Sequence, residues 1–380
     1  MSQGKKGLDG VSIGDSRLSL VNGTEGKLIY AGYKIEDLAA YALYEEVVYL
    51  LWEGKLPNAT ELETLRASIA ENAGIPEEVM ALLHTFPKDA DAMAMLRTAT
   101  SALALYDADS ENYSLDSLRR KSVRLTGQVT TLSAAWMRIR KGLAPVAPRK
   151  DLTLAANFMY MVNGAEPEST AVDAINAYMV LLTEHGMNAS TFAARVTVST
   201  GSDMHSAIVS AMGTLKGPAH GGANTEAMLQ FMEIGEVANV EPWFTQNIKN
   251  GDRRIMGIGH RVYKALDPRA AVLRERSEAL AKASGNTKWF EIADNLANLA
   301  LADSYFIERR LYPNVDYFSA IALYTLDIDV DMFTPLFAMS RMAGWTAHIV
   351  EQVTSNRLIR PSVDYVGPMD LEWKAIQDRE

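Results

Sequence analysis

Three of the six histidines stand beside glycines, a setting that suits contact with another molecule. They are His185 in EHGMN, His220 in PAHGG and His260 in GIGHR. Glycine lets a ligand approach the main chain closely, and loop residues at helix ends are common carriers of function. Imidazoles placed in this way can serve a metal, a nucleophilic serine or a bound substrate. The alternative is that the glycines only cap helices.

Two of these chemistries are not favoured by the rest of the sequence. The chain has no HExxH motif, no pair of histidines four residues apart and no cysteine, so a metal site is not expected. It also lacks a G-x-S-x-G elbow and the alternating strands that such an elbow requires. His84, His205 and His348 lie inside helical patterns, and we interpret them as core or helix-surface residues.

A basic stretch follows the histidine loops. Residues 249–264 read KNGDRRIMGIGHRVYK and carry five cations against Asp252, in a chain of net charge −10. Small and apolar residues separate the cations, a pattern that favours a ligand with phosphates at one end and a flat or apolar group at the other. A solvated basic loop is the alternative.

Further charged residues stand where helices are expected to begin or to be buried. Asp267 and Pro268 form a helix start, and Arg269 then opposes the helix dipole unless an anion is bound there. Asp316, in YPNVDYFS, is either an N-cap or a catalytic base. Arg341 lies in a strongly apolar helix, so we expect an anionic partner for it.

The elements that must position these residues are mostly helical. Residues 17–21 and 27–30 alternate in type around NGTEG, which predicts a β-hairpin. Asn58 with Glu61 predicts a capping box, and a long helix is expected from Leu115 to Ile139. Apolar periodicity predicts further helices near 151–162, 171–184, 190–200, 204–216, 222–233, 241–249, 268–283, 288–310, 317–326 and 330–354.

Composition narrows the class of protein. The chain has 380 residues, no cysteine and no uninterrupted apolar run of the length that a membrane span needs. The start MSQGKKGLDG lacks the apolar region of a secretory signal. The acidic balance argues against binding to nucleic acid or to an anionic membrane. We therefore expect a cytoplasmic protein.

Six motifs follow one another along the chain, and their order can be compared with that of known families. They are, in order, EHGMNAST, GPAHGGAN, IMGIGHRVYKALDPRA, YPNVDYFS, FTPLFAMSRMAGWTAHIVEQ and RLIRPSVDYVG. This combination resembles the citrate synthase family, in its shorter bacterial and archaeal form. The resemblance implies an almost all-α homodimer with the active site in a cleft between two domains. The large domain would be 1–221 and 320–380, with a C-terminal segment reaching the partner, and the small domain 222–319.

The resemblance further implies a reaction and a role for each residue. The family condenses acetyl-CoA with oxaloacetate and water to give citrate and CoA, without a cofactor or a metal. Asp316 matches the base that removes a methyl proton, His220 the donor to the enolate oxygen, and His260 the group that polarises the oxaloacetate carbonyl. The implied oxaloacetate ligands are His185, Asn188, Arg269, Arg341 and, across the dimer, Arg360; the implied CoA ligands are Arg253, Ile255, Met256, Gly257, Gly259, Arg261, Lys264 and Asn314.

Two other functions stay open at this point. A 2-methylcitrate synthase shares the fold and the machinery but takes propionyl-CoA, and one methylene in an acyl pocket changes preference by only ~1–3 kcal/mol. A catalytically silent protein that binds CoA or a tricarboxylate is the alternative of another class. The sequence does not fix thermal stability, allosteric effectors or assembly beyond a dimer.

Overall fold

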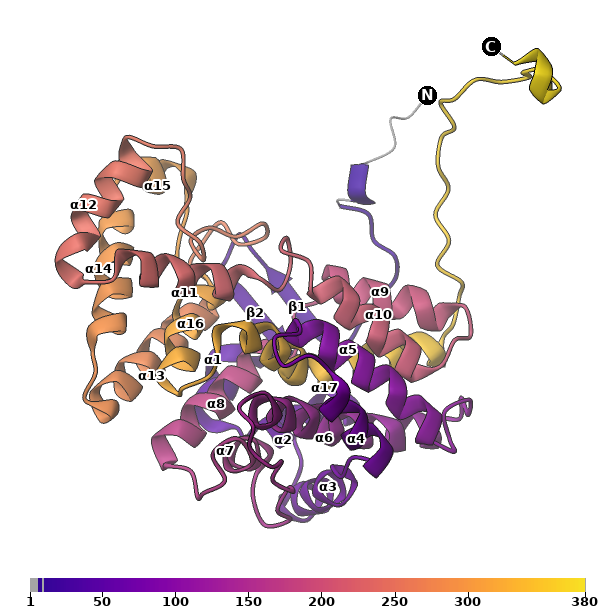
Figure 1. Cartoon of the computed structure of the whole chain (residues 1–380), viewed down its shortest axis with the longest axis horizontal. Coiled ribbons are helices and arrows are strands. Elements are labelled where there is room, and N and C mark those ends of the chain that lie inside the picture. Colours follow the sequence, from indigo (N-terminus) through magenta and orange to yellow (C-terminus); the bar gives the residue numbers. More distant parts are fainter. Residues whose placement is uncertain (1–5, 9, 380) are drawn as a thin grey trace.

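The computed structural model describes residues 6–8 and 10–379. Residues 1–5, 9 and 380 lie outside the described residues, and they include part of the stretch that we interpreted as lacking a secretory signal. Helices dominate the described chain, and the strands form one small sheet (Figure 1). The predicted all-α class is therefore confirmed.

The sheet begins with the predicted hairpin. Strand β1 (Ser19–Asn22) pairs antiparallel with β2 (Lys27–Tyr30), and the short β3 (Tyr33–Lys34) adds a third strand beside β2. Tyr30 is fully buried, and its hydroxyl donates to the main-chain carbonyl of Glu184 at 2.6 Å. The hairpin is thereby fixed to the segment that carries His185.

One group of helices surrounds the long helix α6 and the apolar helix α17. Within this group, the most extensive packing is between α9 and α10 and between α17 and α6. Its members are α1 (Ile35–Tyr41), α2 (Tyr44–Glu53), α3 (Ala59–Asn72), α4 (Glu77–Thr85), α5 (Ala92–Leu103), α6 (Leu115–Arg140), α7 (Leu154–Asn163), α8 (Ser169–Leu182), α9 (Ala189–Ser199), α10 (Met204–Leu215) and α17 (Phe333–Thr354).

A second group lies side by side on the left of Figure 1. It consists of α11 (Ala223–Ile234), α12 (Val240–Phe244) with a π-helical continuation (Thr245–Lys249), α13 (Pro268–Ser284), α14 (Lys288–Ala302), α15 (Ser304–Arg309) and α16 (Val315–Thr325). This group falls within the predicted small domain, but the predicted boundary at residue 319 lies inside the continuous helix α16. The domain limits stay a prediction.

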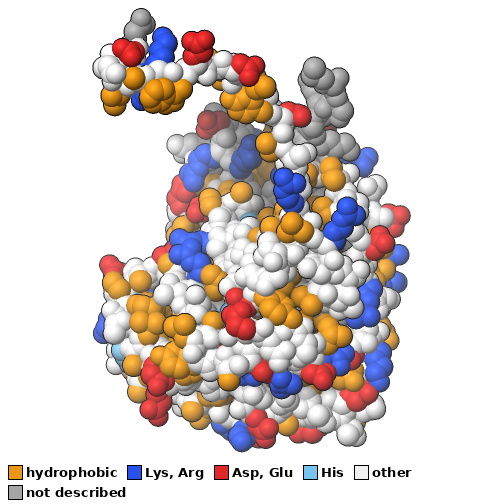
Figure 2. All heavy atoms as spheres, turned by 90° about the vertical axis from the view of Figure 1, so that its right-hand side faces the viewer, with side chains coloured by type: hydrophobic (Ala, Val, Ile, Leu, Met, Phe, Trp, Pro, Cys, Tyr) orange, Lys and Arg blue, Asp and Glu red, His pale blue; other side chains and the backbone are white. Residues whose placement is uncertain are grey.

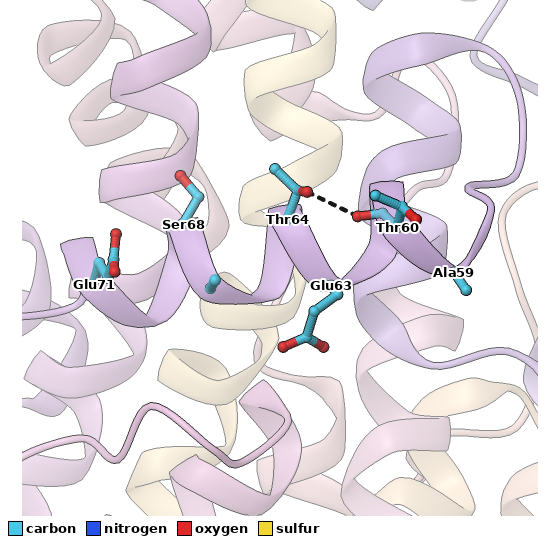
Figure 3. Close-up of a pocket in the computed structure, with 7 residues that line it drawn as sticks. Ala59, Thr60, Glu63, Thr64, Ser68 and Glu71 are labelled. Atoms are coloured by element: carbon cyan, nitrogen blue, oxygen red, sulfur yellow. Dashed lines mark hydrogen bonds between the residues drawn. The ribbon is translucent and has the colours of Figure 1, made fainter.

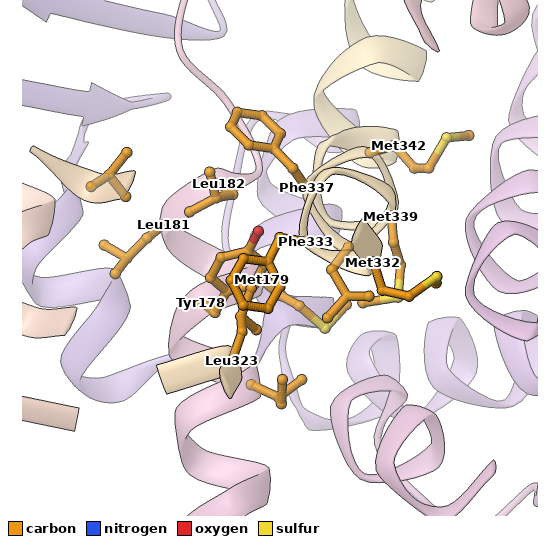
Figure 4. Close-up of a cluster of buried hydrophobic side chains, with 14 of the residues drawn as sticks. Tyr178, Met179, Leu181, Leu182, Leu323, Met332, Phe333, Phe337, Met339 and Met342 are labelled. Atoms are coloured by element: carbon orange, nitrogen blue, oxygen red, sulfur yellow. The ribbon is translucent and has the colours of Figure 1, made fainter. Parts of the chain in front are cut away.

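The core joins the two groups. Figure 4 shows buried apolar side chains of α8, α16 and α17 meeting in one cluster, in which Tyr178, Leu323, Phe333 and Phe337 take part. Because α16 carries Asp316 in its first turn and α17 contains Arg341, this packing fixes two predicted site residues relative to each other. Burial of large aromatic and aliphatic side chains is the main stabilising contribution here.

The chain ends in an extended arm. After Thr354 the backbone has little regular structure and projects away from the helical body (Figure 1). Figure 2 shows hydrophobic side chains along this arm, and Val363 is 91% exposed and Trp373 80% exposed. Such an apolar surface on one chain is typical of a segment that packs against another molecule.

Candidate active site

Loops between helices bring the three glycine-flanked histidines together. The ring centroids of His185 and His260 lie 5.6 Å apart, and the ring of Tyr263 contacts both. His220 contacts Ser190, which belongs to the start of the helix after the His185 loop. These loops join α8 to α9, α10 to α11, and the π-helical segment to α13. Residues 75 positions apart in the sequence therefore share one region.

Hydrogen bonds assign the proton of His220. The main-chain N–H of Ser190 points at Nε2 of His220 from 3.3 Å, and Ser190 Oγ lies 2.8 Å from the same atom. An N–H donor requires an acceptor, so Nε2 carries the lone pair and Nδ1 carries the proton. Burial, with Arg341 nearby, lowers the pKa of His220 to about 4. At neutral pH this residue is an uncharged Nδ1–H donor.

His260 has the opposite tautomer. Its Nδ1 accepts the main-chain N–H groups of Val262 and Tyr263 at 3.0 and 3.1 Å. The proton is therefore on Nε2, which is left to donate to a ligand. Burial, followed by the charge of Arg269, lowers the pKa of His260 to about 4. Two neutral donors of complementary tautomer thus serve one region.

Asp316 lies in the first turn of α16. The helix cap is Asn314, whose side chain accepts the Asp316 N–H at 2.9 Å, so the interpretation of Asp316 as the N-cap is wrong. Burial raises the pKa of Asp316 to about 6, and the charges of Arg269 and Arg341 counteract that rise. The same two arginines lower the pKa of His185, which burial already depresses. Asp316 and His185 therefore share one electrostatic environment.

The two arginines differ in their partners. Arg269 is 2% exposed and donates to Asp267 through Nε at 3.0 Å and through Nη2 at 2.8 Å. Asp267 in turn caps α13 and accepts the N–H of Val315, the first residue of α16. Arg341 is 1% exposed, and within residues 6–8 and 10–379 it forms no ion pair. Its Nε donates to the Leu182 carbonyl.

No carboxylate among the described residues forms an ion pair with Arg341, although the charge of the buried Glu184 favours its cationic form. The face of Phe337 lies 4.8 Å from its guanidinium carbon, and burial lowers the pKa of Arg341. A buried guanidinium supported by a carbonyl and an aromatic ring is well suited to bind a ligand carboxylate.

A cavity of about 820 Å³ opens beside His260. Its wall includes the predicted CoA ligands Arg253, Ile255, Gly259 and Arg261. Arg253 is also held by Glu233, at 2.6 and 2.8 Å, and stacks on a tryptophan ring. Lys249 and Arg254, two further cations of the basic stretch 249–264, also line the wall. Tyr305 and Arg309 line it too, and sequence reasoning did not assign them as ligands.

The other predicted CoA ligands support this cavity. Asn314 donates through Nδ2 to the Gly259 carbonyl at 2.8 Å and through its main-chain N–H to the Gly257 carbonyl at 2.9 Å. Gly257 has φ = 77°, and a Cβ there would lie 2.9 Å from the Cα of Tyr317. The main-chain N–H of Met256 is bound by Gln230, and Lys264 is exposed. Only glycine at 257 therefore lets the loop lie against α16.

Comparison with known proteins identifies the family. A family model described as "Citrate synthase, C-terminal domain" matches residues 7–362. Citrate synthase 2 of Bacillus subtilis is 44% identical, with 98% of this chain and 99% of that one covered. The 2-methylcitrate synthase of Mycobacterium tuberculosis is 39% identical, with 96% and 90% covered. The chain belongs to the citrate synthase family.

Solved structures of citrate synthases share the whole fold. The ternary complex of carboxymethyl coenzyme A and oxaloacetate with citrate synthase from Thermoplasma acidophilum has a TM-score of 0.92 at 37% identity, with 98% of this chain and 99% of that one covered. Citrate synthase from Pyrobaculum aerophilum has a TM-score of 0.91 at 38% identity, with 98% and 95% covered.

Two residues implied by the citrate synthase resemblance are placed differently from the rest. Arg360 is exposed at the start of the C-terminal arm, beside Ile359, whose main-chain N–H donates to Ser199 Oγ at 3.1 Å at the C-terminal end of α9, opposite the end that carries Ser190. The side chain of Asn188 caps α9, accepting the Thr191 N–H at 3.1 Å and donating to the Gly186 carbonyl. Within one chain, Arg360 is therefore not brought to the histidines.

A second hollow has no connection with this citrate synthase site. It runs along α3, where Figure 3 shows Thr60, Glu63, Thr64, Ser68 and Glu71 on one face of the helix.

The described residues contain no group of three or more potential ligand side chains that could hold a metal ion. Nor do they include a helix with the length and apolar character needed to cross a bilayer.

Proposed function

We propose that the chain condenses acetyl-CoA with oxaloacetate and water, giving citrate and CoA. The observation that carries this proposal is the pair of neutral histidines in complementary tautomers, together with a carboxyl group of raised pKa that responds to the charges of the same arginines. Each group matches one requirement of an enolisation followed by attack on a ketone. The names of the relatives support the same reaction.

Oxaloacetate is a dianion and needs cations that are already in position. Arg341 offers a buried guanidinium without an ion pair among the described residues, and Arg269 is held in place by Asp267. The ring of His185 contacts that of His260, its Nε2 lies 3.2 Å from the Tyr263 hydroxyl, and its pKa responds to both arginines. We assign these three residues to the oxaloacetate carboxylates, with Arg360 of the partner subunit as the fourth ligand.

The chemical steps then follow from the tautomers. Asp316 removes a proton from the acetyl methyl group, while the Nδ1–H of His220 donates to the thioester oxygen as it becomes an enolate. The methylene carbon attacks the oxaloacetate ketone, whose oxygen accepts a hydrogen bond from the Nε2–H of His260. That oxygen ends as the hydroxyl group of citryl-CoA, with the proton that Asp316 removed. Water then cleaves the thioester of citryl-CoA and releases citrate, CoA and a proton. One donor aimed at such an oxyanion contributes ~2.7–4 kcal/mol.

We also propose that the cleft closes between a large domain (1–221 and 320–380) and a small domain (222–319). Closure would exclude water while the enolate exists. Oxaloacetate binding should therefore precede productive binding of acetyl-CoA. Calorimetric titration of acetyl-CoA with and without oxaloacetate checks this order, and equal affinities would contradict it. The cytoplasmic location expected from the sequence stays a prediction.

A thiol-release assay tests the reaction itself. Purified protein is given oxaloacetate with either acetyl-CoA or propionyl-CoA, and free CoA is followed by a thiol reagent, which the cysteine-free chain does not consume. We expect turnover with a higher kcat/KM for acetyl-CoA. A higher value for propionyl-CoA would make the chain a 2-methylcitrate synthase. Binding of both substrates without thiol release would indicate a silent binding protein.

A further inference from the structure

The turn of the β1–β2 hairpin lies against the loop that carries His260. A Cβ built on Gly23 would stand 2.1 Å from the carbonyl oxygen of Val262 and 2.6 Å from its carbonyl carbon. The main-chain N–H of Lys264 donates to the Gly23 carbonyl at 2.8 Å. Gly23 does not have a positive φ, so close approach, and not backbone freedom, requires glycine here.

The peptide that Gly23 touches is also the one that orients His260. The carbonyl of Val262 and the N–H of Tyr263 belong to a single planar unit. That N–H, together with the N–H of Val262, holds Nδ1 of His260 as an acceptor. A displacement of the Val262 carbonyl therefore moves a donor that fixes the histidine tautomer.

The hairpin is a firm support for this contact. Asn22 holds the turn by accepting the N–H groups of Thr24 and Glu25, both at 3.1 Å. Farther along β2, Leu28 and Tyr30 are fully buried, and the Tyr30 hydroxyl is anchored on the Glu184 carbonyl. The turn is thus tied to the body of helices, whereas the His260 loop extends from the second group.

From this chain of contacts, we propose that Gly23 is a positioning residue for His260. The hairpin turn holds the Val262–Tyr263 peptide so that its N–H faces Nδ1, and this leaves Nε2–H for the ketone of the substrate. The role in catalysis rests on the proposed function of His260. The effect on the tautomer does not rest on the proposed function, because the tautomer of His260 is a property of the protein without substrate.

The test compares Gly23→Ala with Gly74→Ala. Gly74 also lacks a positive φ, and a Cβ there meets nothing within 4 Å, so it is a matched control. Ring-¹⁵N histidine NMR reads the tautomer of His260, and loss of its signals in His260→Asn assigns them. We expect the Nε2–H form in the wild type and in Gly74→Ala, and a mixture of tautomers in Gly23→Ala.

Activity supplies the second measurement. A displacement of about 1 Å in a catalytic group reduces turnover by roughly 10²-fold, so kcat of Gly23→Ala should fall to that extent while Gly74→Ala stays at the wild-type level. If Gly23→Ala does not fold, Asn22→Ala loosens the same turn without adding a Cβ, and a partial tautomer change with a smaller loss of kcat is expected.

The outcomes separate the two proposals. An unchanged Nε2–H signature in the folded turn variants would overturn the positioning role, whatever happens to kcat. An unchanged kcat in Gly23→Ala, with an active wild type, would overturn it as well. A wild type without thiol release would refute the proposed function alone, since the NMR comparison still decides whether Gly23 positions His260.

Discussion

At the scale of single residues, the site is built from groups whose charge is suppressed by burial. The pKa of Asp316 is raised to about 6, and the pKa values of His220 and His260 are lowered to about 4. Between these values the histidines are neutral donors while the carboxyl group becomes an available base. Perturbed pKa values of opposite direction within one cleft are typical of acid–base sites.

The acid limb of the pH–rate profile should report Asp316. As pH rises through about 6 the carboxyl group ionises, so kcat/KM should increase tenfold per pH unit below that value and level off above it. His220 and His260 are already neutral at pH 5 and above, so their titration adds no further limb to the pH–rate profile. Steady-state rates from pH 5 to 8, with stability followed in parallel, check this profile. A limb near pH 4, or a decline above pH 7, would contradict it.

Asp316→Asn should lower the rate of thiol release and raise the free energy of unfolding at neutral pH. Because the pKa in the folded state lies above 3.8, the stability contributed by the neutral acid is present below pH 4 and is lost as pH rises through about 6. At pH 7.5 the substitution should therefore stabilise the protein by about 1–3 kcal/mol, with less effect at pH 4. Thiol release should fall at least 10²-fold. Unfolding by urea at both pH values checks this, and equal effects would contradict it.

At the scale of elements, the start of α16 joins the catalytic carboxyl group to the glycine loop. Asn314 caps the helix with Oδ1 and holds the Gly259 carbonyl with Nδ2, so one side chain sets Asp316 and the approach to His260. Asp267 links the same helix to α13. Helix starts are precise supports because their free N–H groups demand partners.

Asn314→Ala and Asn58→Ala separate capping from function. Each asparagine caps a helix with its side chain, but Asn58 begins α3, away from the histidines. Loss of a cap costs ~1 kcal/mol, so both variants should lose about that amount in urea unfolding. Only Asn314→Ala should also lose kcat, by roughly 10-fold or more, because Asp316 is displaced. Equal activity in the two variants would contradict this role of Asn314.

Much of this scaffold is readable in the sequence. The hairpin around NGTEG, the Asn58–Glu61 capping box and the Asp267–Pro268 helix start all appear as predicted, because each depends on neighbouring residues only. The long helix, predicted to Ile139, ends at Arg140. Local chemistry and apolar periodicity are sufficient for such features.

The misses are of a different kind. The predicted helix 288–310 is divided at Asp303, which caps α15, and the predicted helix 241–249 changes to a π-helical form at Thr245. Helix α5 carries no expectation from the sequence, and α4 carries only the helical pattern around His84. Such breaks depend on packing that apolar periodicity does not encode.

The site shows the same division between local and distant contacts. The glycines identify the three histidine loops, and the family resemblance supplies the roles of their residues. The tautomer of His220 depends on Ser190, 30 positions away, whereas that of His260 is set by the neighbouring Val262 and Tyr263. Arg309 lines the cavity because of a tertiary fold, although the pair Arg309–Arg310 just before LYPN is a signal that could have indicated it. Gly23 is part of the predicted turn NGTEG, but its contact with the His260 loop has no local signature, since its partner Val262 is distant in sequence.

At the scale of the whole molecule, the C-terminal arm suggests exchange between two subunits. Its apolar side chains are exposed in one chain, and Arg360 lies at its start. A second copy that buries this arm would receive Arg360 at its own active site, as the resemblance implies. An isologous dimer gives each subunit the arm of the other.

Complementation between two variants tests the exchange. Arg360→Ala and Asp316→Asn are each impaired alone, but a mixed dimer contains one site with both native residues if Arg360 acts across the interface. Co-refolding equal amounts should restore about one quarter of wild-type specific activity, because half of the dimers are mixed and one site in each works. Activity that stays at the average of the two separate variants would show that Arg360 serves its own subunit.

The buried guanidinium of Arg341 has a consequence for the lifetime of the protein. Glu184 offsets its charge only from a distance, without an ion pair, so burial of this cation still costs free energy, and a bound dicarboxylate would reduce that cost. The free energy of unfolding should then rise with oxaloacetate concentration, by about 2.7 kcal/mol at a hundredfold excess over Kd. Resistance to heat and to proteolysis should rise with it. In a cell that lacks oxaloacetate, the ligand-free protein would be less stable and more of it would be degraded, so that its abundance follows the supply of its substrate.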